Sequence, residues 1–396
     1  MEQTMTTTDA LLQAVEDIRP LLEKYAPQSE ADRRLADASY DAMRAAGLFR
    51  MLVPRVFGGM ELHLVEAYKV WEAVARIDSA AGWNLQISNA IAGFATWLPA
   101  AGGKEVFGES PDIIAAGGFF PPAAAVPVDG GWRVTGRTPF ASGCHRAQWF
   151  MIPMQEMHGD QPKVDPQTGE PITFIAFFRR ADVEIIDTWH TVGMRGTFSA
   201  DVAVNNVFLP QHRAGVFGPL VDPPPAFAIP AYRLTPWPGV HGEAIVSLGV
   251  ATAAIDKLIN LARTKTPAYS TITLRDREMA QHHAAKATAL VDAAREYLHT
   301  AATEAYTEAE RGALLAEKTK IRCQLSACFV AEACAEAVNL VHQAAGTTGI
   351  RLEPGFERHF RDIHTLTQHA SKSYSRYESV GKMLFGLPQD WVVLNL

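Results

Sequence analysis

The feature that most constrains the fold is a long run of helical sequence from about Gly242 to Phe385. Apolar residues recur in it at helical spacing, in one stripe of Leu248, Ile255, Leu258 and Leu261, a second of Ile321, Leu325, Cys328 and Phe329, and a third of Leu290, Ala294 and Leu298. Short breaks fall at Pro267, Gly312 and Gly346. Long helices joined in this way predict a four-helix bundle.

The first part of the chain, up to about Glu109, is also helical in pattern. Leu11, Val15, Ile18 and Leu22 form a stripe on one helix face, which Pro20 is expected to kink or break. Residues 64–77 return to helix after a turn-rich connector.

From about Ile113 to Pro210 the texture changes to glycine, proline and short β-prone runs. Asp129-Gly130-Gly131 is a hairpin signal between two such runs, so we expect an antiparallel β domain. The chain therefore divides into residues 1–112 (α-helical), 113–215 (β), 216–241 (a Pro-rich linker with Pro219, Pro223, Pro224, Pro225 and Pro230) and 242–396 (helical bundle). The fold class is α+β.

Charge and composition exclude several classes of protein. A net charge of −7 is a poor match to nucleic acid. The four cysteines lack C-x-x-C spacing, so we expect packed thiols, no metal site and a reducing cytoplasm. The first residues lack the apolar stretch of a signal peptide. Residues 79–103 carry no charge, but their Asn, Gln and Pro residues favour a buried helix over a membrane span.

The common catalytic fingerprints are absent from the sequence. It contains no G-x-G-x-x-G after a strand, no G-x-x-x-x-G-K-[ST], no H-E-x-x-H and no G-x-S-x-G. The chemistry must therefore come from a bound cofactor or from side chains collected across domains.

Three segments in order resemble the acyl-CoA dehydrogenase superfamily. They are residues 45–59 (AAGLFRMLVPRVFGG), 191–210 (TVGMRGTFSADVAVNNVFLP) and 342–362 (HQAAGTTGIRLEPGFERHFRD). The resemblance covers nearly the whole chain and implies an N-terminal helical domain, a β domain and a C-terminal four-helix bundle.

A fourth segment, residues 130–149 (GGWRVTGRTPFASGCHRAQW), resembles the two-component flavin-dependent monooxygenase branch of that superfamily. In that branch a Phe-x-Ser-Gly turn faces the flavin, and its serine, here Ser142 beside Gly143, hydrogen-bonds flavin N5. A small hydroxyl on a tight turn suits a close approach to the ring edge, although a plain turn serine has the same pattern. Trp149 follows at strand-like spacing and either shields the ring face or is a core tryptophan.

The catalytic carboxylate of the dehydrogenases has no counterpart in register. Ala370 stands at the usual position, and the alternative position falls near Gly239, with Glu243 the nearest carboxylate but off register. His369 lies next to Ala370, and the resemblance implies a histidine there that faces flavin and substrate from a helix. An imidazole so placed can exchange a proton with the substrate. A merely structural histidine is the alternative.

Some phenol hydroxylases of the branch carry a second histidine eight residues after a Gly-Trp pair. Here Gly82-Trp83 is present, but the position holds Ile91. A less polar or heteroaromatic substrate, or oxygenation at nitrogen or sulfur, becomes more credible than phenol hydroxylation. Residues suited to line an apolar pocket are Trp83, Asn84, Phe94 and Trp97.

The flavin phosphate has two candidate contacts. Arg263 resembles the family arginine that reaches the flavin of a neighbouring subunit, with a solvated helix-terminal arginine as the alternative. Gly346, Thr347, Thr348 and Gly349 offer a phosphate cradle that is in any case a helix–helix turn. Bundle helices with apolar residues on more than one face predict a homotetramer, or at least a dimer.

Together these features predict an oxygenase component that takes FMNH2 or FADH2 from a separate NAD(P)H:flavin reductase. With O2 it would oxygenate a small aromatic or heteroaromatic molecule through a flavin C4a-hydroperoxide. Two alternatives remain at this stage, an acyl-CoA dehydrogenase-type enzyme with a displaced base and a non-catalytic scaffold of the same fold.

Overall fold

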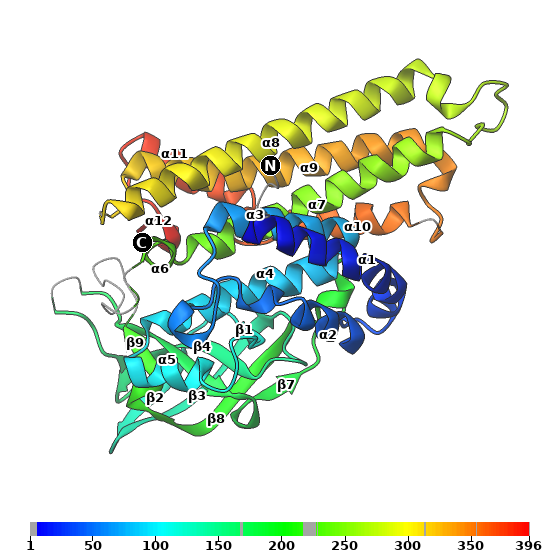
Figure 1. Cartoon of the computed structure of the whole chain (residues 1–396). Helices are drawn as coiled ribbons and strands as arrows, with labels where there is room; N and C mark the ends of the chain where they lie inside the picture. Colours follow the sequence, from blue (N-terminus) through cyan, green and yellow to red (C-terminus); the bar gives the residue numbers. More distant parts are fainter. Residues whose placement is uncertain are drawn as a thin grey trace, which may run out of the picture.

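A computed structural model of the whole chain describes residues 6–166, 169–216, 227, 229–312, 314–353 and 355–395. Three layers are stacked in it (Figure 1): the long bundle helices, a middle layer of N-terminal helices, and a β domain on the side away from the bundle.

The N-terminal domain is a set of helices packed around one apolar stripe. Its helices are α1 (Thr7–Ala31), α2 (Asp37–Ala45), α3 (Leu64–Ile77), α4 (Ser79–Gly93) and α5 (Ala100–Phe107), with 3-10 turns η1 (Leu48–Arg50), η2 (Arg55–Phe57) and η3 (Phe94–Trp97). Of the kink or break expected at Pro20, the break does not occur, because α1 runs through Pro20 as one helix. Leu11, Val15 and Leu22 are fully or almost fully buried on its inner face, while Pro20 is exposed, so core packing outweighs the lost hydrogen bond.

Helix α4 is buried on nearly all of its faces, as expected for residues 79–93. It contacts α3, α7 and the start of the β domain, so it lies between the bundle and the sheet. Close approach is possible because Gly82 faces Ala75 of α3, where an added Cβ atom would lie 2.5 Å from the Ala75 Cβ.

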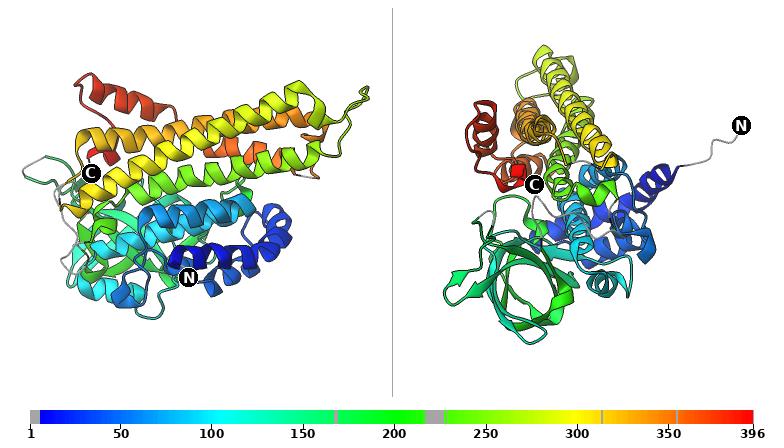
Figure 2. Two further views of the ribbon diagram at one scale, coloured as in Figure 1. Left: turned by 45° about the horizontal axis from the view of Figure 1, so that its top comes forward. Right: turned by 90° about the vertical axis from the view of Figure 1, so that its left-hand side faces the viewer.

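The β domain is one curled sheet (Figure 2). Its strands are β1 (Ala115–Gly117), β2 (Ala123–Val128), β3 (Gly131–Ala141), β4 (Trp149–His158), β5 (Gln161–Pro162), β6 (Thr173–Arg179), β7 (Glu184–Ile186), β8 (Ala200–Pro210) and β9 (Ala214–Val216), with η4 (Arg180–Asp182), η5 (Arg195–Thr197) and η6 (Gln211–Arg213) between them. The main strand order is β7-β8-β3-β2-β4-β6-β9.

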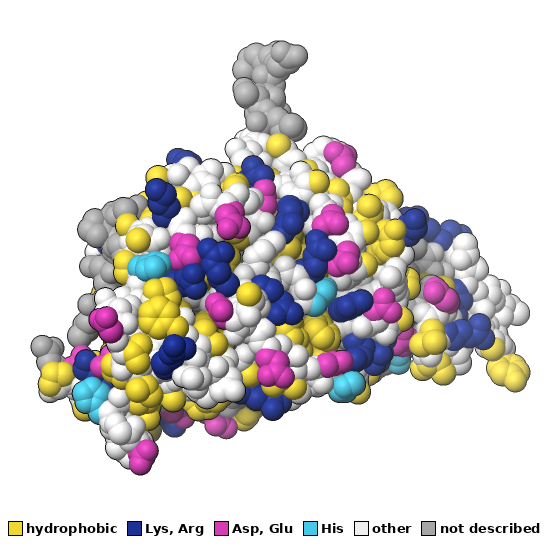
Figure 3. All heavy atoms as spheres, turned by 90° about the horizontal axis from the view of Figure 1, so that it is seen from below, with side chains coloured by type: hydrophobic (Ala, Val, Ile, Leu, Met, Phe, Trp, Pro, Cys, Tyr) yellow, Lys and Arg dark blue, Asp and Glu magenta, His cyan; other side chains and the backbone are white. Residues whose placement is uncertain are grey.

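The expected purely antiparallel sheet is wrong in one respect. The β2–β3 hairpin at Asp129-Gly130 forms as predicted, but β4 pairs in parallel with both β1 and β2. The sheet is therefore mixed, because pairing between strands distant in the chain is set by the tertiary fold and not by the strand pattern. Figure 3 shows Lys/Arg and Asp/Glu side chains interspersed on the face of the molecule opposite the bundle.

The C-terminal bundle is built from α7 (Trp237–Ala262), α8 (Glu278–Glu310), α9 (Glu317–Ala345) and α10 (Phe356–Leu366), followed by α11 (Ser375–Leu384) and α12 (Val392–Asn395). The short elements are α6 (Pro230–Arg233), η8 (Leu274–Asp276) and η9 (Gly346–Thr348). All four cysteines are buried, three of them on α9, in agreement with their expected packing role. Of the predicted linker prolines, Pro219, Pro223, Pro224 and Pro225 lie outside the described residues, while Pro230 begins α6.

Two bundle segments are long and apolar enough to cross a membrane by length and composition, Trp237–Ala262 and Glu317–Thr348. In each, 61% of the most apolar window is buried inside the molecule. Their apolar character is thus accounted for by the core of the bundle.

Candidate active site

The Ser142-Gly143 turn lies at the end of β3, where the register of the strand shifts. Gly143 has φ +71°, and an added Cβ atom would lie 2.6 Å from the Tyr40 hydroxyl and 3.0 Å from Asn84 Oδ1. Glycine is therefore required by both conformation and space. Phe140 also has a positive φ of 62° and is 65% exposed, so this turn holds an uncommon conformation next to a buried serine.

Trp83 connects this turn to the bundle. Its indole N–H donates a 2.9 Å hydrogen bond to Ser142 Oγ. The His369 ring stands edge-on to the Trp83 ring at 5.5 Å between centroids, and the Lys372 ammonium lies 5.7 Å from the Trp83 centroid. Two residues singled out from the sequence, Ser142 and His369, therefore contact the same tryptophan.

His369 does not lie on a helix, which corrects the sequence-based expectation. Helix α10 ends at Leu366, and residues 367–374 form an irregular connection to α11. In this connection His369 Nδ1 lies 2.8 Å from Glu243 Oε2 and 3.0 Å from Ser371 Oγ. Ser371 Oγ donates a short hydrogen bond to the same Glu243 oxygen. Glu243, the carboxylate that the sequence places out of register, thus contacts both His369 and Ser371.

The contacts of Glu243 determine the tautomer of His369. Ser371 Oγ gives its one hydrogen to Glu243, so at the 3.0 Å contact Nδ1 must donate to Ser371 Oγ and carries a hydrogen. The Ser371 backbone N–H also points at Nδ1, but at 3.4 Å that contact is the weaker one. In the neutral ring Nε2 then carries the lone pair. The side chain is 35% exposed, and Nε2 has no hydrogen-bond partner in the described part of the chain.

Lys372 is the buried cation of the site. Its ammonium donates to the Glu243 carbonyl oxygen and, at 3.2 Å, to Ser247 Oγ. Burial lowers the pKa of Lys372 to about 8, while the negative charge of Glu243 acts in the opposite direction. We name Trp83, Ser142, Glu243, His369 and Lys372 the Trp83 cluster.

A buried ion network holds the elements of the cluster together. Asp362, from the Arg-Asp pair at 361–362, accepts from the Met194 backbone N–H at 2.6 Å and from Ser79 Oγ at 2.6 Å. Arg358 on the same helix binds Asp78 at 2.7 Å. The start of α4, the loop before β8 and the helix that precedes His369 are therefore fixed to one another, which gives Asp362 and Arg358 a structural role.

The other predicted pocket residues are more dispersed. Asn84 lies behind the Ser142 turn, and its amide points at the Gly196 carbonyl at 3.5 Å. Trp149 is 5% exposed in a second core cluster, with the Arg179 and Arg213 guanidinium groups over its ring at 4.9 and 5.3 Å. No described contact joins Trp149 to the Trp83 cluster, so its position fits the core-tryptophan alternative.

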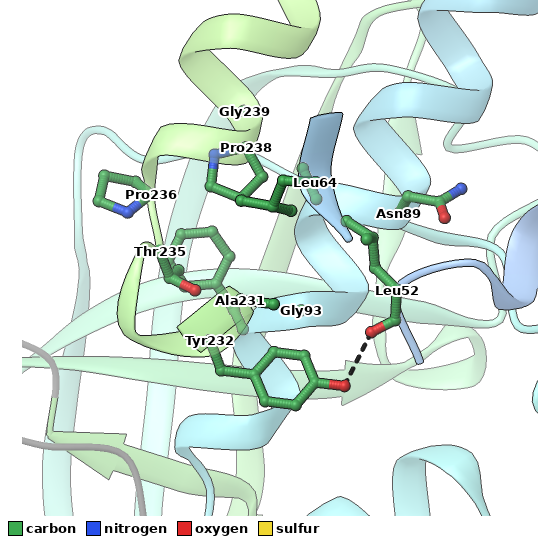
Figure 4. A pocket seen from close by; sticks show the side chains of 12 residues that line it. Leu52, Leu64, Asn89, Gly93, Ala231, Tyr232, Thr235, Pro236, Pro238 and Gly239 are labelled. Carbon is green, nitrogen blue, oxygen red and sulfur yellow. Dashed lines mark hydrogen bonds between the residues drawn. The ribbon is translucent and has the colours of Figure 1, made fainter. Parts of the chain in front are cut away.

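A small, mostly apolar pocket, partly open to solvent, lies beside α4, α6 and the start of α7 (Figure 4). It is lined by Leu52, Leu64, Asn89, Ala90, Gly93, Phe94, Ala231, Tyr232, Thr235, Pro236, Pro238 and Gly239. Phe94 lines this pocket, whereas Trp97 is buried nearby and does not line it. The Tyr232 hydroxyl donates to the Leu52 carbonyl at 3.0 Å, which leaves a mostly apolar wall.

The pocket and the Trp83 cluster share two helices. Trp83 and Ala90 lie on one face of α4, seven residues apart, and Phe94 follows directly after the end of that helix. On α7, Gly239 at the pocket is one helical turn, roughly 6 Å, from Glu243. Ile91, which stands where some relatives of the fold have a histidine, is 2% exposed in the second core cluster.

The predicted phosphate contacts meet at another place, the end of the bundle where α7 and α9 finish. Lys265 Nζ donates to the Ala345 carbonyl at 2.5 Å and to Thr348 Oγ1 at 2.6 Å. Arg263 is exposed two residues earlier. Lys265 follows Arg263 closely in the chain and binds the turn 346–349, so both predicted phosphate contacts lie at the same end of the bundle. Burial lowers the pKa of Lys265, with Arg351 adding a smaller repulsion.

Sequence reasoning missed Glu243, Lys372 and Lys265 as members of these sites. Glu243 could have been identified as a charged residue within the otherwise apolar start of a helix. Lys265 could have been identified as a second positive charge two residues after Arg263. Lys372 has no such signal, because only the return of the chain after α10 brings it under Trp83.

Comparison with known proteins agrees with this architecture. The acyl-CoA dehydrogenase N-terminal domain model matches residues 2–105, and the acyl-CoA dehydrogenase C-terminal domain model matches residues 241–374. These matches bracket the β domain and place the chain in the class defined by its fold, the acyl-CoA dehydrogenase-like flavoproteins.

The more specific relatives are monooxygenases. An indole-3-acetate monooxygenase of Pseudomonas putida is 31% identical over 380 residues, covering 96% of this chain and 93% of the relative. The flavin-dependent monooxygenase oxygenase subunit HsaA of Rhodococcus jostii is 27% identical, covering 95% and 98%. The structure of XiaF from Streptomyces in complex with FADH2 and glycerol is similar with a TM-score of 0.87, at 25% identity and 97% coverage of both chains. The chain belongs to the flavin-dependent monooxygenase branch of this family and is an oxidoreductase that uses a flavin. The scaffold alternative is thereby overturned.

Proposed function

We propose that the chain is the oxygenase component of a two-component monooxygenase. It would accept reduced FMN or FAD from a separate NAD(P)H:flavin reductase and use O2 to hydroxylate a small aromatic or heteroaromatic molecule. The observation that carries the proposal is the Trp83 cluster, which joins the serine of the Phe-x-Ser-Gly turn to the neighbouring His369 and Glu243 side chains.

The residues present fit a flavin ring at the Ser142 turn. Gly143 has no room for a side chain, so the backbone there is drawn back against Tyr40 and Asn84. Ser142 Oγ has the reach of a short side chain on that turn and is the group we expect to contact flavin N5. When bound, reduced flavin supplies the oxygen chemistry by forming a C4a-hydroperoxide with O2.

In this proposal the residues of the chain position the substrate and manage its proton. The apolar walls of the pocket beside Phe94 would pack against the ring of the substrate and exclude water from it. His369 Nε2, whose lone pair is fixed by the hydrogen bonds from Nδ1 to Ser371 and from Ser371 to Glu243, accepts the proton that the substrate loses when it is hydroxylated. Glu243 is a positioning residue, because it acts through the imidazole.

The substrate we favour is heteroaromatic. The wall of the pocket is mostly apolar, and the position of the second histidine of some phenol hydroxylases is occupied by buried Ile91. A relative whose name specifies indole-3-acetate is 31% identical, and its substrate is of this class. Indole-3-acetate is therefore the first compound to test.

The flavin tail would be held by a second copy of the chain. Arg263, Lys265 and the turn 346–349 gather positive charge and small residues at the end of the bundle, and no described contact links them to Ser142 in the same chain. A site completed by a neighbouring subunit agrees with the expected homotetramer, or at least dimer. Light scattering at micromolar concentration tests this, and a monomer there would contradict it.

The dehydrogenase alternative is not favoured by the geometry. A dehydrogenase base must be a carboxylate open to the substrate, but Glu243 Oε2 is occupied by both Ser371 and His369. Of the His369 and Glu243 side chains, the imidazole of His369 is the more exposed one.

Substitution of His369 by alanine tests the proposal. The variant should hydroxylate about 10²-fold more slowly, the low end for a lost acid–base group. NADH consumption by an added reductase should continue, because flavin reduction occurs on another protein, and H2O2 release should rise as product falls.

His364→Ala is the matched control for this experiment. His364 lies five residues earlier, with Nε2 bonded to Asn339 Oδ1 at 2.9 Å inside the bundle, and its loss should leave the ratio of product to O2 unchanged. Full coupling of O2 to product in a folded His369→Ala variant would show that His369 is structural and that the proposed proton acceptor is wrong.

A further inference from the structure

The irregular connection 367–374, which carries His369, is held from two sides. On one side Ser371 Oγ donates to Glu243 of α7. On the other side Gln324 of α9 donates from Nε2 to the Ser371 carbonyl at 2.7 Å. A segment without regular structure depends on such outside partners to satisfy its backbone groups. The position of Ser371, and with it that of the neighbouring His369, therefore depends on α9 as well as on α7.

The side-chain amide of Gln324 has only one possible orientation. Its Oε1 accepts from the Trp391 indole N–H at 3.0 Å, and an indole nitrogen can only donate. Its Nε2 donates to the Ser371 carbonyl, which can only accept. A flipped amide would oppose two donors at one end and two acceptors at the other. Because Gln324 is 0% exposed, water does not readily replace either partner.

Trp391 belongs to the C-terminal segment, which we define as residues 389–394. The Arg376 guanidinium of α11 lies over the Trp391 ring, 4.2 Å from its centroid. Asp390, the residue before Trp391, accepts from the buried Ser379 hydroxyl of α11 at 2.7 Å. The C-terminal segment is thus fixed to α11, and from there the indole N–H of Trp391 reaches Gln324 on α9.

These contacts form one path from the C-terminal segment to the proposed proton acceptor. The path runs from Trp391 through Gln324 to the Ser371 carbonyl. The hydroxyl of the same Ser371 accepts from His369 Nδ1 at 3.0 Å. We propose that Trp391 and Gln324 are positioning residues and that the C-terminal segment places His369 through them. This inference rests on the proposed function and assigns to it two residues outside the Trp83 cluster.

Loss of the path would leave the Ser371 carbonyl without its donor from α9. The Ser371 hydroxyl and the His369 ring would then be less firmly placed, and Nε2 would spend less time facing the substrate. Reduced flavin would still react with O2, but a larger share of the oxygen would leave as H2O2. The expected signature is a lower ratio of product to O2 consumed, with the affinity for reduced flavin unchanged.

Two variants interrupt the path at different points. Trp391→Phe keeps an aromatic ring beside Arg376 and removes only the indole N–H. Gln324→Met keeps the length of the side chain and removes both of its hydrogen bonds. Trp132→Phe is the matched control, because the Trp132 indole N–H also makes a 3.0 Å hydrogen bond, to Glu156 in the β domain.

Hydrogen–deuterium exchange of the protein alone tests whether the path exists. The quantity measured is the exchange rate of the backbone amides in residues 367–374. We expect it to rise about three- to tenfold in Trp391→Phe and in Gln324→Met, the effect of one lost hydrogen bond. The double variant should exchange no faster than Gln324→Met, because both changes act on one path. Trp132→Phe should exchange like the wild type.

Oxygenation of indole-3-acetate with photoreduced FMN tests whether the path positions His369. The ratio of product to O2 consumed should fall about three- to tenfold in both variants and stay unchanged in Trp132→Phe. The Kd for reduced FMN should stay at the wild-type value. When His369 is already alanine, Trp391→Phe should cause no further loss, because it acts through the imidazole.

The outcomes separate this inference from the proposed function. Unchanged exchange of residues 367–374 in folded Trp391→Phe would overturn the path. Faster exchange with an unchanged product ratio, or a further loss in the variant that lacks His369, would show that the C-terminal segment does not act through the histidine. Trp391→Phe changes only a half-buried residue near the chain end, so it decides the matter if Gln324→Met does not fold. A wild type that oxygenates neither indole-3-acetate nor other small aromatic compounds would overturn the proposed function itself.

Discussion

Replacing Glu243 by glutamine removes the charge that fixes the tautomer of His369 while keeping the size of the side chain. In the wild type the carboxylate accepts from Ser371, whose Oγ in turn accepts from His369 Nδ1 at 3.0 Å, and Glu243 Oε2 lies 2.8 Å from Nδ1. A hydrogen bond to a charged group is worth about 1.5–3 kcal/mol, and about 1.4 kcal/mol corresponds to a factor of ten in rate. If this energy holds the imidazole in its working form, Glu243→Gln should lower the hydroxylation rate by about 10- to 100-fold.

The assay measures product formed per reduced flavin consumed, with H2O2 as the competing product. Because Glu243 acts through His369, the double variant with His369→Ala should be no slower than His369→Ala alone. Glu332→Gln is the matched control, since Glu332 lies on an exposed part of α9 and binds Tyr377 at 2.9 Å. Its coupling should equal that of the wild type.

Two results would refute this reasoning. Unchanged coupling in a folded Glu243→Gln variant would show that the carboxylate does not position the histidine. Losses that multiply in the double variant would show that Glu243 and His369 act independently, as expected if Glu243 itself contacted the substrate.

Two other substitutions probe the charges around the sites. The pKa of Lys372 is about 8 in the folded chain against an ordinary 10.5, so the folded state binds fewer protons between these two pH values. The buried ammonium therefore costs about 3 kcal/mol of stability below pH 8, and this cost disappears as the pH rises to 10.5. Urea titrations should therefore show that the free energy of unfolding of the wild type, relative to that of Lys372→Met, rises by up to this amount from pH 7.5 to pH 10.5. The same difference taken between the wild type and the surface variant Lys286→Met should not change over this pH range. Lys265→Met should weaken binding of reduced FMN by about 1–3 kcal/mol. Binding of reduced riboflavin, which lacks the phosphate, should stay unchanged. Equal losses for both ligands would contradict a phosphate contact.

Much of the fold could be predicted because it depends on local pattern. The stripe of α1, the helix 64–77 and the β2–β3 hairpin all follow from spacing or turn residues in one short segment. The parallel pairing of β4 and the uninterrupted course of α1 through Pro20 depend on contacts between distant segments, which a local pattern does not encode.

The residues of the candidate site also divide into those that a local sequence motif predicts and those that depend on contacts between distant segments. Ser142 and His369 were reached through motifs that resemble a family, and the structure places both against Trp83. Glu243 was set aside because counting along the sequence puts it out of register, yet the irregular connection after α10 brings His369 to it.

The central claim is that this chain directs the reaction of reduced flavin with O2 toward oxygenation. Rapid mixing of the anaerobic protein–flavin complex with O2, followed by flavin absorbance and H2O2 release, tests it and requires no substrate in the reaction. We predict a transient oxygenated flavin that forms before oxidised flavin appears and lasts longer than any such species of free reduced flavin. Reoxidation in a single step, at the rate of the free flavin and with H2O2 released at once, would contradict the account.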